Sequence, residues 1–194
     1  FLTSDDKSSV LAELAFGDRD YEIEKSNVVL MESANRLTLD SLNEKQLKKL
    51  NQLIEQKRGT PEFISLIGRF SAKQFYSDVL KISADSSNPQ LAADAMKLLL
   101  RKKQDTRVKD LILHSPPETQ QNLCDALANS GTNEGGAILN GIAKQRFFDL
   151  SMRNYAIKKM GESQSGARTI LSWITKKEQM DPGTVANSVD KGMK

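Results

Sequence analysis

Residues 123–149 (LCDALANSGTNEGGAILNGIAKQRFFD) and residues 155–181 (YAIKKMGESQSGARTILSWITKKEQMD) carry the pattern that decides the fold. Each stretch contains a helix of small and apolar residues, a polar break with glycine, and a second apolar helix. One uniform shift along the chain superposes the two stretches and places Ile138, Leu139 and Ile142 on Ile170, Leu171 and Ile174. A fixed period of about 20 to 50 residues is typical of a solenoid, in which each helix pair buries its apolar face against the next pair.

Working outward from these stretches, apolar spacing predicts helices along the rest of the chain. Prolines at positions 61, 89 and 117 stand where a first helical turn accepts them. No segment alternates with a period of two residues, so the predicted class is all-α. The first expected helix is capped by residues 3–6, carries Val10, Leu11, Leu14 and Ala15, and ends at Gly17-Asp18. The others cover residues 27–37, 43–57, 61–70, 71–83, 90–102, 106–114, 119–129, 137–145, 150–160 and 167–177, with a last one capped by Asp181-Pro182.

Composition excludes some kinds of site and leaves several classes of protein open. The net charge of +3 is mild, whereas a nucleic-acid-binding protein usually has a stronger, clustered excess of cations. The single cysteine excludes an internal disulfide framework and a multi-thiol metal site, but it fits cytoplasm and periplasm equally. No apolar run approaches the roughly 20 residues of a membrane helix, and no signal peptide is visible. The start at Phe1 and the lack of a capping repeat before Lys194 lead us to expect a piece of a longer protein.

The layout resembles HEAT-type and armadillo-type helical repeats, which implies an irregular right-handed α-solenoid. Residues 63–75 (FISLIGRFSAKQF), 91–100 (LAADAMKLLL) and 166–177 (GARTILSWITKK) narrow the resemblance. They are similar to the helical spacer in large multidomain proteins of planctomycete-type bacteria that end in a c-type haem domain. In those proteins the spacer lies between a propeller similar to sugar dehydrogenases and the haem domain.

This resemblance implies a secreted or periplasmic parent protein that is an oxidoreductase, with this part as its non-catalytic spacer. The haem motif Cys-x-x-Cys-His is absent here, because Cys124 is followed by Asp-Ala-Leu. No residue of this chain is therefore expected to hold a cofactor, and a c-type haem is expected only elsewhere in the parent. The whole chain is predicted to be one repeat domain, with residues 1–60 less regular than residues 61–194.

A basic run is the strongest charge cluster in the sequence. Its cations could meet phosphates or an acidic partner domain, although Asp94, Asp105 and Asp110 lie among them. No aromatic residues alternate with them to stack on bases, which weakens single-strand binding. A solvated helix end is the favoured interpretation. The run consists of Lys97, Arg101, Lys102, Lys103, Arg107 and Lys109.

Four other features are candidates with a simpler structural explanation. Trp173 aligns with Gly141, and packing between repeats is favoured over a role as an interface anchor. His114 ends a helix with only Asp110 one turn back, so an interaction with the helix dipole is favoured over a metal or general-base role. Cys124 is expected to be a buried small hydrophobic residue rather than a reactive thiol. Residues 131–136 (GTNEGG) lack the Lys-Ser/Thr of a phosphate-binding loop and are expected to form a turn.

Three hypotheses about function follow. The first is a scaffold or spacer that contacts neighbouring domains of the same chain or another protein, with a concave face made by helices 106–114, 137–145 and 167–177. The alternative is a nucleic-acid-binding repeat that uses the Lys97–Lys109 face. An enzyme ranks lowest, because no motif places a nucleophile or an acid/base pair. The sequence indicates neither the oligomeric state nor the identity of a partner.

Overall fold

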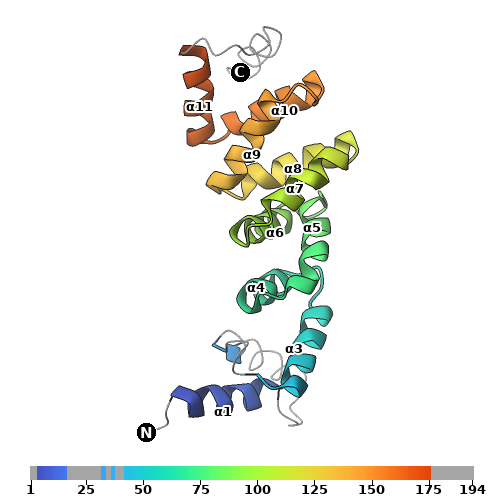
Figure 1. The fold of residues 1–194 in the computed structure, drawn as a ribbon, viewed down its shortest axis with the longest axis vertical. Coiled ribbons are helices and arrows are strands. Elements are labelled where there is room, and N and C mark those ends of the chain that lie inside the picture. Colours follow the sequence, from blue (N-terminus) through green and yellow to red (C-terminus); the bar gives the residue numbers. More distant parts are fainter. Residues whose placement is uncertain (1–3, 17–31, 34–35, 38–41, 176–194) are drawn as a thin grey trace. The chain divides into compact units, whose positions relative to one another are not determined.

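The computed structural model describes residues 4–16, 32–33, 36–37 and 42–175 of the 194-residue chain (Figure 1). Every regular element within those residues is a helix, which confirms the all-α prediction for this part of the chain. The chain divides into two compact units, Phe1–Phe75 and Tyr76–Lys194. The predicted single repeat domain stays a prediction.

The described part of the first unit contains three helices that are joined by two contacts. α1 (Ser4–Phe16) packs on α3 (Glu44–Gln56), and α3 packs on α4 (Pro61–Phe70). A capping box starts α3: the Asn43 side chain accepts a hydrogen bond from the Gln46 amide, and the Gln46 side chain accepts one from the Asn43 amide, both at 3.0 Å. This cap fixes where α3 begins and so which of its faces meets α4.

One prediction at the end of this unit is wrong. The sequence predicts a single helix over residues 71–83, but a 3₁₀ turn, η2 (Lys73–Phe75), precedes the shorter helix α5 (Tyr76–Ser83). Ser71 ends α4 in the left-handed conformation with φ of 49°, and the Ala72 amide donates to the Ile67 carbonyl at 3.2 Å. Most of the predicted helix over 27–37 lies outside the described residues.

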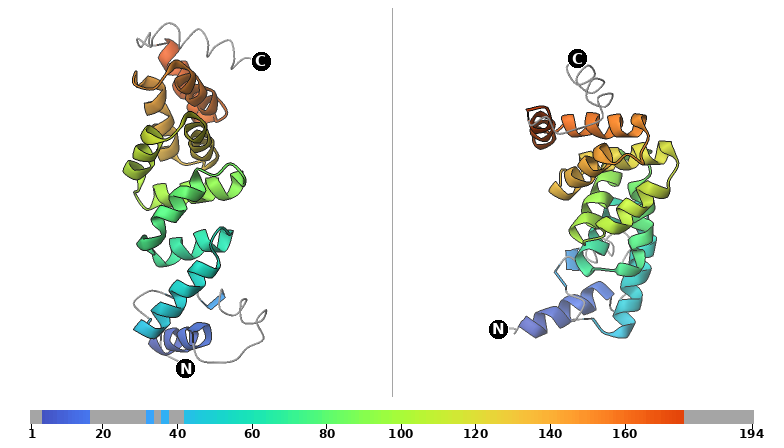
Figure 2. Two further views of the ribbon diagram at one scale, coloured as in Figure 1. Left: turned by 90° about the vertical axis from the view of Figure 1, so that its right-hand side faces the viewer. Right: turned by 45° about the horizontal axis from the view of Figure 1, so that its top comes forward.

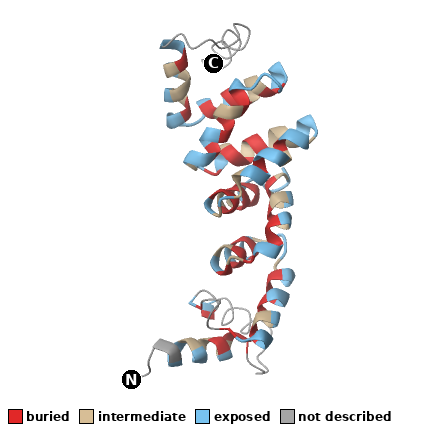
Figure 3. Cartoon of the chain, viewed as in Figure 1, coloured by how far each residue is buried: buried red, intermediate tan, exposed pale blue. Residues whose placement is uncertain are grey.

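The second unit consists of consecutive helices that pack on their neighbours (Figure 2). α5 packs on α6, α6 on α8, and α8 on α10, while α9 contacts both α8 and α10. α7 contacts α6 and α8, and α11 packs on α10. Buried residues run along the helix faces that meet (Figure 3). The bounds are α6 (Pro89–Arg101), α7 (Asp105–His114), α8 (Pro117–Asn129), α9 (Asn133–Lys144), α10 (Leu150–Gly161) and α11 (Gln164–Thr175).

α6 and α8 share part of their pattern of burial, although α6 buries further residues (Leu91, Ala92, Ala93 and Leu100) that have no buried counterpart in α8. Both contain 13 residues, and both begin with proline at the first position, Pro89 in α6 and Pro117 in α8. When the two prolines are superposed, four buried positions coincide: Ala95, Met96, Leu98 and Leu99 in α6, and Leu123, Cys124, Ala126 and Leu127 in α8. The two helices therefore bury equivalent faces.

The starts of α9 and α11 differ from the prediction. The sequence predicts that they start at residues 137 and 167, after glycine-rich loops, but they begin at Asn133 and Gln164. Thr132 Oγ1 accepts a hydrogen bond from the Gly135 amide at 3.0 Å, and Ser163 Oγ accepts one from the Gly166 amide at 3.0 Å. Such caps stabilise a first helical turn, so both glycines lie inside a helix.

Gly135 and Gly166 lie where two backbones come close together. A Cβ at Gly135 would lie 2.7 Å from the carbonyl oxygen of Leu127, and a Cβ at Gly166 would collide with the carbonyl of Met160. Each glycine thus lets a second helix approach the end of the first helix of its pair.

These glycines give a different register between the helices than the uniform shift predicted from the sequence. Along the chain, Gly135 and Gly166 are two residues closer together than Pro117 and Leu150, which start α8 and α10. The uniform shift predicted from the sequence therefore averages two different spacings. In the glycine register Trp173 corresponds to Ile142, and both are buried. The match of Trp173 with Gly141 belongs to the uniform shift and stays a prediction.

Candidate interaction surface

The six cations of the predicted basic run lie at the end of α6, in the following turn and on α7. We call this set the basic cluster: Lys97, Arg101, Lys102, Lys103, Arg107 and Lys109. Lys97 and Arg101 are four residues apart on α6 and so lie on one helix face. Arg101, Lys103, Arg107 and Lys109 are exposed, and Lys97 and Lys102 are half-buried. Residues 102–104 join α6 to α7, so the two groups of cations are neighbours along the chain.

Acidic side chains neutralise part of the basic cluster. Lys103 Nζ lies 3.4 Å from Glu134 Oε1 on α9, and Lys109 Nζ lies 3.6 Å from Asp105 Oδ2. The pKa of Glu134 is lowered by a backbone hydrogen bond and, to a lesser extent, by Lys103. Exposed ion pairs of this kind contribute little to stability. The two arginines, Arg101 and Arg107, are the exposed cations best suited to bidentate binding of a carboxylate or phosphate.

Trp173 does not belong to an exposed surface. Its exposed fraction is 5%, and the Lys144 Nζ of α9 lies 5.0 Å from its ring centroid. An ammonium over an indole ring is a favourable cation–π contact. The Trp173 side chain of α11 is therefore buried and lies against Lys144 of α9.

His114 and Cys124 are placed as structural residues. His114 Nδ1 lies 2.8 Å from the carbonyl oxygen of Asp110 at the end of α7. Within the described residues, no three His, Cys, Asp or Glu side chains are grouped to hold a metal ion. Cys124 is fully buried, and burial, followed by the charge of Asp125, raises the pKa of its thiol to about 12. A thiol with so high a pKa is a poor nucleophile at neutral pH.

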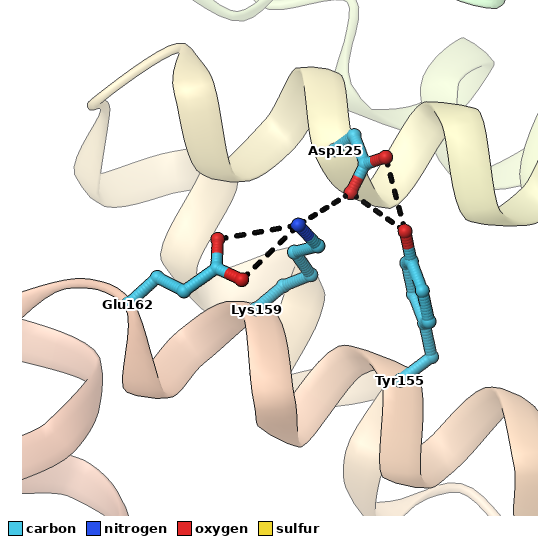
Figure 4. A network of polar contacts seen from close by, with 4 residues as sticks. All are labelled: Asp125, Tyr155, Lys159 and Glu162. Carbon is cyan, nitrogen blue, oxygen red and sulfur yellow. Dashed lines mark hydrogen bonds and ion pairs between the residues drawn. The ribbon is translucent and has the colours of Figure 1, made fainter. Parts of the chain in front are cut away.

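A polar network that the sequence did not reveal joins α8 to α10 (Figure 4). Tyr155 Oη lies 2.9 Å from Oδ1 and 3.0 Å from Oδ2 of Asp125. Lys159 Nζ lies 3.0 Å from Asp125 Oδ1 and 3.1 Å from Glu162 Oε1. Lys159 also lies over the Tyr155 ring, at 5.7 Å from its centroid.

The surroundings of Tyr155 and Lys159 favour the protonated form of each side chain. Burial and the hydrogen bond to Asp125 raise the pKa of Tyr155 to about 12. Burial disfavours the Lys159 ammonium, but hydrogen bonds to Asp125 and Glu162 outweigh that effect and raise its pKa above the ordinary value of 10.5. A catalytic tyrosine or lysine acting as a base needs the opposite shift. The network is suited to fastening α10 to α8.

The sequence contains only a weak signal for this network. Tyr155 and Lys159 are four residues apart and so share a helix face, but Asp125 lies 30 residues before Tyr155. The pairing depends on which side of α8 faces α10, which spacing within one helix does not determine.

Comparisons with known protein families, with curated proteins and with solved structures gave no match. Within the described residues, no helix is long and apolar enough to cross a bilayer.

Proposed function

We propose that this chain is a non-catalytic helical-repeat scaffold that binds a neighbouring domain or another protein. In this proposal the helix pairs form an irregular right-handed α-solenoid of the HEAT or armadillo kind. The observation that carries it is the packing of successive first helices, α6 on α8 and α8 on α10. Repeats that contact only their neighbours build extended surfaces, and binding to such surfaces is their usual role.

The titratable groups of the second unit support a scaffold over an enzyme. Tyr155 and Cys124 have raised pKa values, so neither is primed as a base or nucleophile at neutral pH. Lys159 is fixed between two carboxylates. These groups fasten helices together.

The basic cluster is the surface that we propose for the partner. Its exposed arginines, Arg101 and Arg107, fit an acidic protein segment. Nucleic acid is the rival ligand, and the lack of aromatic residues among these cations, which could stack on bases, counts against binding of single strands.

A binding experiment with the 194-residue chain tests this proposal. The probes are a fluorescent glutamate-rich peptide and short single-stranded and duplex oligonucleotides, each titrated at two salt concentrations. The variant R101E/R107E removes the exposed arginines. The variant K158E/R168E is the control, because it changes the net charge equally at exposed positions on α10 and α11.

We expect peptide binding to weaken about ten-fold in R101E/R107E and to persist in the control. Oligonucleotide binding that falls steeply with salt and disappears only in R101E/R107E would establish the nucleic-acid alternative. Equal loss in both variants would mean nonspecific charge attraction and would reject the basic cluster as a binding surface.

The haem-bearing parent protein is a separate part of the proposal. If the chain is a spacer in a secreted or periplasmic oxidoreductase, its open reading frame encodes a Cys-x-x-Cys-His motif downstream. Sequencing the gene on both sides tests this directly. A frame without that motif removes the proposed haem-bearing parent and leaves the scaffold proposal in place.

A further inference from the structure

α9 contains the Asn-Gly pair of this sequence, Asn140-Gly141. In such a pair the backbone nitrogen of the glycine can attack the side-chain carbonyl carbon of the asparagine. A C–N bond forms, the bond to the side-chain nitrogen breaks, and ammonia leaves with the proton of the backbone amide, which produces a five-membered succinimide. Water then opens this ring at either carbonyl and gives aspartate or isoaspartate. Asparagine is a thermolabile residue for this reason, and a following glycine hinders the attack least because it has no Cβ.

The helix opposes this reaction as long as α9 is formed. The helix continues past the pair, since the Gln145 amide donates to the Gly141 carbonyl at 3.1 Å. A helical ψ angle at Asn140 keeps the Gly141 nitrogen away from the side-chain carbonyl carbon. An α-helix also uses each such amide in a hydrogen bond to the carbonyl four residues earlier. The rate of the reaction should therefore follow how often α9 opens.

The composition of α9 makes it a weak helix. Its 12 residues include Gly135, Gly136 and Gly141, and glycine is the poorest helix former after proline. The contact with α8 requires glycine at position 135, but nothing lies within 4 Å of an added Cβ at Gly136 or Gly141. Within the described residues, Asn140 Oδ1 is buried without a hydrogen-bond partner, which is also unfavourable. The formation of α9 therefore depends on its packing against α8 and α10.

We propose that Asn140-Gly141 is a site of spontaneous deamidation that α9 keeps latent, so that the chain modifies itself when α9 opens. Isoaspartate adds a methylene group to the main chain and interrupts the helical hydrogen bonds. Aspartate places a carboxylate at the position of the buried Asn140 Oδ1. Either product should weaken the packing of α9 on α8 and α10. This inference is independent of what the basic cluster binds.

Mass spectrometry of peptides from the full chain, incubated at neutral pH, measures deamidation at position 140. The reference is a synthetic peptide of residues 137–144 (AILNGIAK), which is too short to form a stable helix in water. Thr132→Ala removes the side-chain cap of α9 and leaves the pair intact. Gly136→Ala is the opposite change, because alanine strengthens the helix at a position with open space. Gly141→Ala removes the pair and is the negative control, and circular dichroism verifies that each variant is folded.

We expect deamidation of Asn140 to be about ten-fold slower in the folded chain than in the peptide. Relative to the unmodified chain, it should be about five-fold faster in Thr132→Ala and about three-fold slower in Gly136→Ala. A rate in the folded chain equal to that of the peptide would overturn the proposal, because the helix would then give no protection. Equal rates in Thr132→Ala, Gly136→Ala and the unmodified chain would overturn it too, because opening of α9 would not control the reaction. So would an Asn140 that stays unmodified in Thr132→Ala.

Discussion

Tyr155 on α10 is within hydrogen-bond distance of both carboxylate oxygens of Asp125 on α8, at 2.9 and 3.0 Å. Asp125 also accepts from Lys159, so one carboxylate on α8 meets two side chains from one face of α10. The apolar contacts between the helices set how closely they approach. The carboxylate adds direction, because its oxygens fix the position of α10 along α8.

Tyr155→Phe should lower the free energy of unfolding by about 1 kcal/mol, because it removes a hydrogen bond to a charged acceptor while keeping the ring. Urea denaturation measures this. In an Asp125→Ala background the same change should cost about 0.5 kcal/mol less, since the partner is already absent. Equal costs in both backgrounds would show that the two side chains are not coupled.

Alkaline pH should destabilise the second unit through Cys124 and Tyr155. Their ordinary pKa values are 9.0 and 10.0, and in the folded chain both pKa values rise to about 12. Folding therefore favours the protonated forms. The stabilisation is complete below pH 9 and is lost as the pH rises toward 12.

Cys124→Ala removes one of these two groups, so its stability should fall less steeply with pH than that of the unmodified chain. Urea midpoints measured from about pH 8 to about pH 11 give the two curves. Parallel curves would mean that the pKa of the Cys124 thiol is the same in the folded and the unfolded chain, against the expected difference.

Alanine substitution should separate the contact glycines from an ordinary helical glycine. Gly135→Ala and Gly166→Ala should each destabilise by about 1–3 kcal/mol, since the added methyl group meets a backbone carbonyl. Gly141→Ala is the control: nothing lies within 4 Å of its added Cβ, and alanine should stabilise the helix by about 0.5–1 kcal/mol. Thermal unfolding, monitored by circular dichroism, ranks the three variants by stability. A Gly141→Ala variant that is less stable than the unmodified chain would contradict this prediction.

Trp173 should report its burial by fluorescence. We expect a blue-shifted emission and weak quenching by acrylamide in the folded chain. Lys144→Met, which keeps most of the side-chain length and removes the charge over the ring, should lower stability by about 0.5–1 kcal/mol. An emission equal to that of the urea-unfolded protein would place Trp173 in solvent instead.

Local signals predict the fold correctly where a short stretch decides the outcome. α4 begins at its first-position proline as predicted, and α6 and α8 begin at Pro89 and Pro117, one and two residues before the predicted starts. The start of α3 lies next to its capping residue Asn43, one residue after the predicted start. The same local rules misplace the starts of α9 and α11, because they treat glycine as a break. There, glycine is required by a contact with the preceding helix, which no local rule includes.

In the candidate site, too, some features follow from local sequence and others depend on contacts between helices. The basic cluster and the buried Cys124 follow from spacing and composition, since both depend on one or two neighbouring helices. The partner of Tyr155 and the burial of Trp173 depend on the register between successive helix pairs. That register drifts, because the spacing between helix starts differs from the spacing between the contact glycines.

The contact of Gly135 with Leu127, and of Gly166 with Met160, has a consequence for how this chain tolerates insertions. The distance along the chain from the first helix start to the glycine differs by two residues between the two pairs, yet both glycines meet a carbonyl of the preceding helix. Extra residues in the turns before Thr132 and Ser163 should therefore be accommodated as loops, whereas any side chain at the two glycines should push the helices apart. We therefore expect insertions and deletions to be tolerated in those turns. The two glycines are the positions best suited to aligning one helix pair with the other.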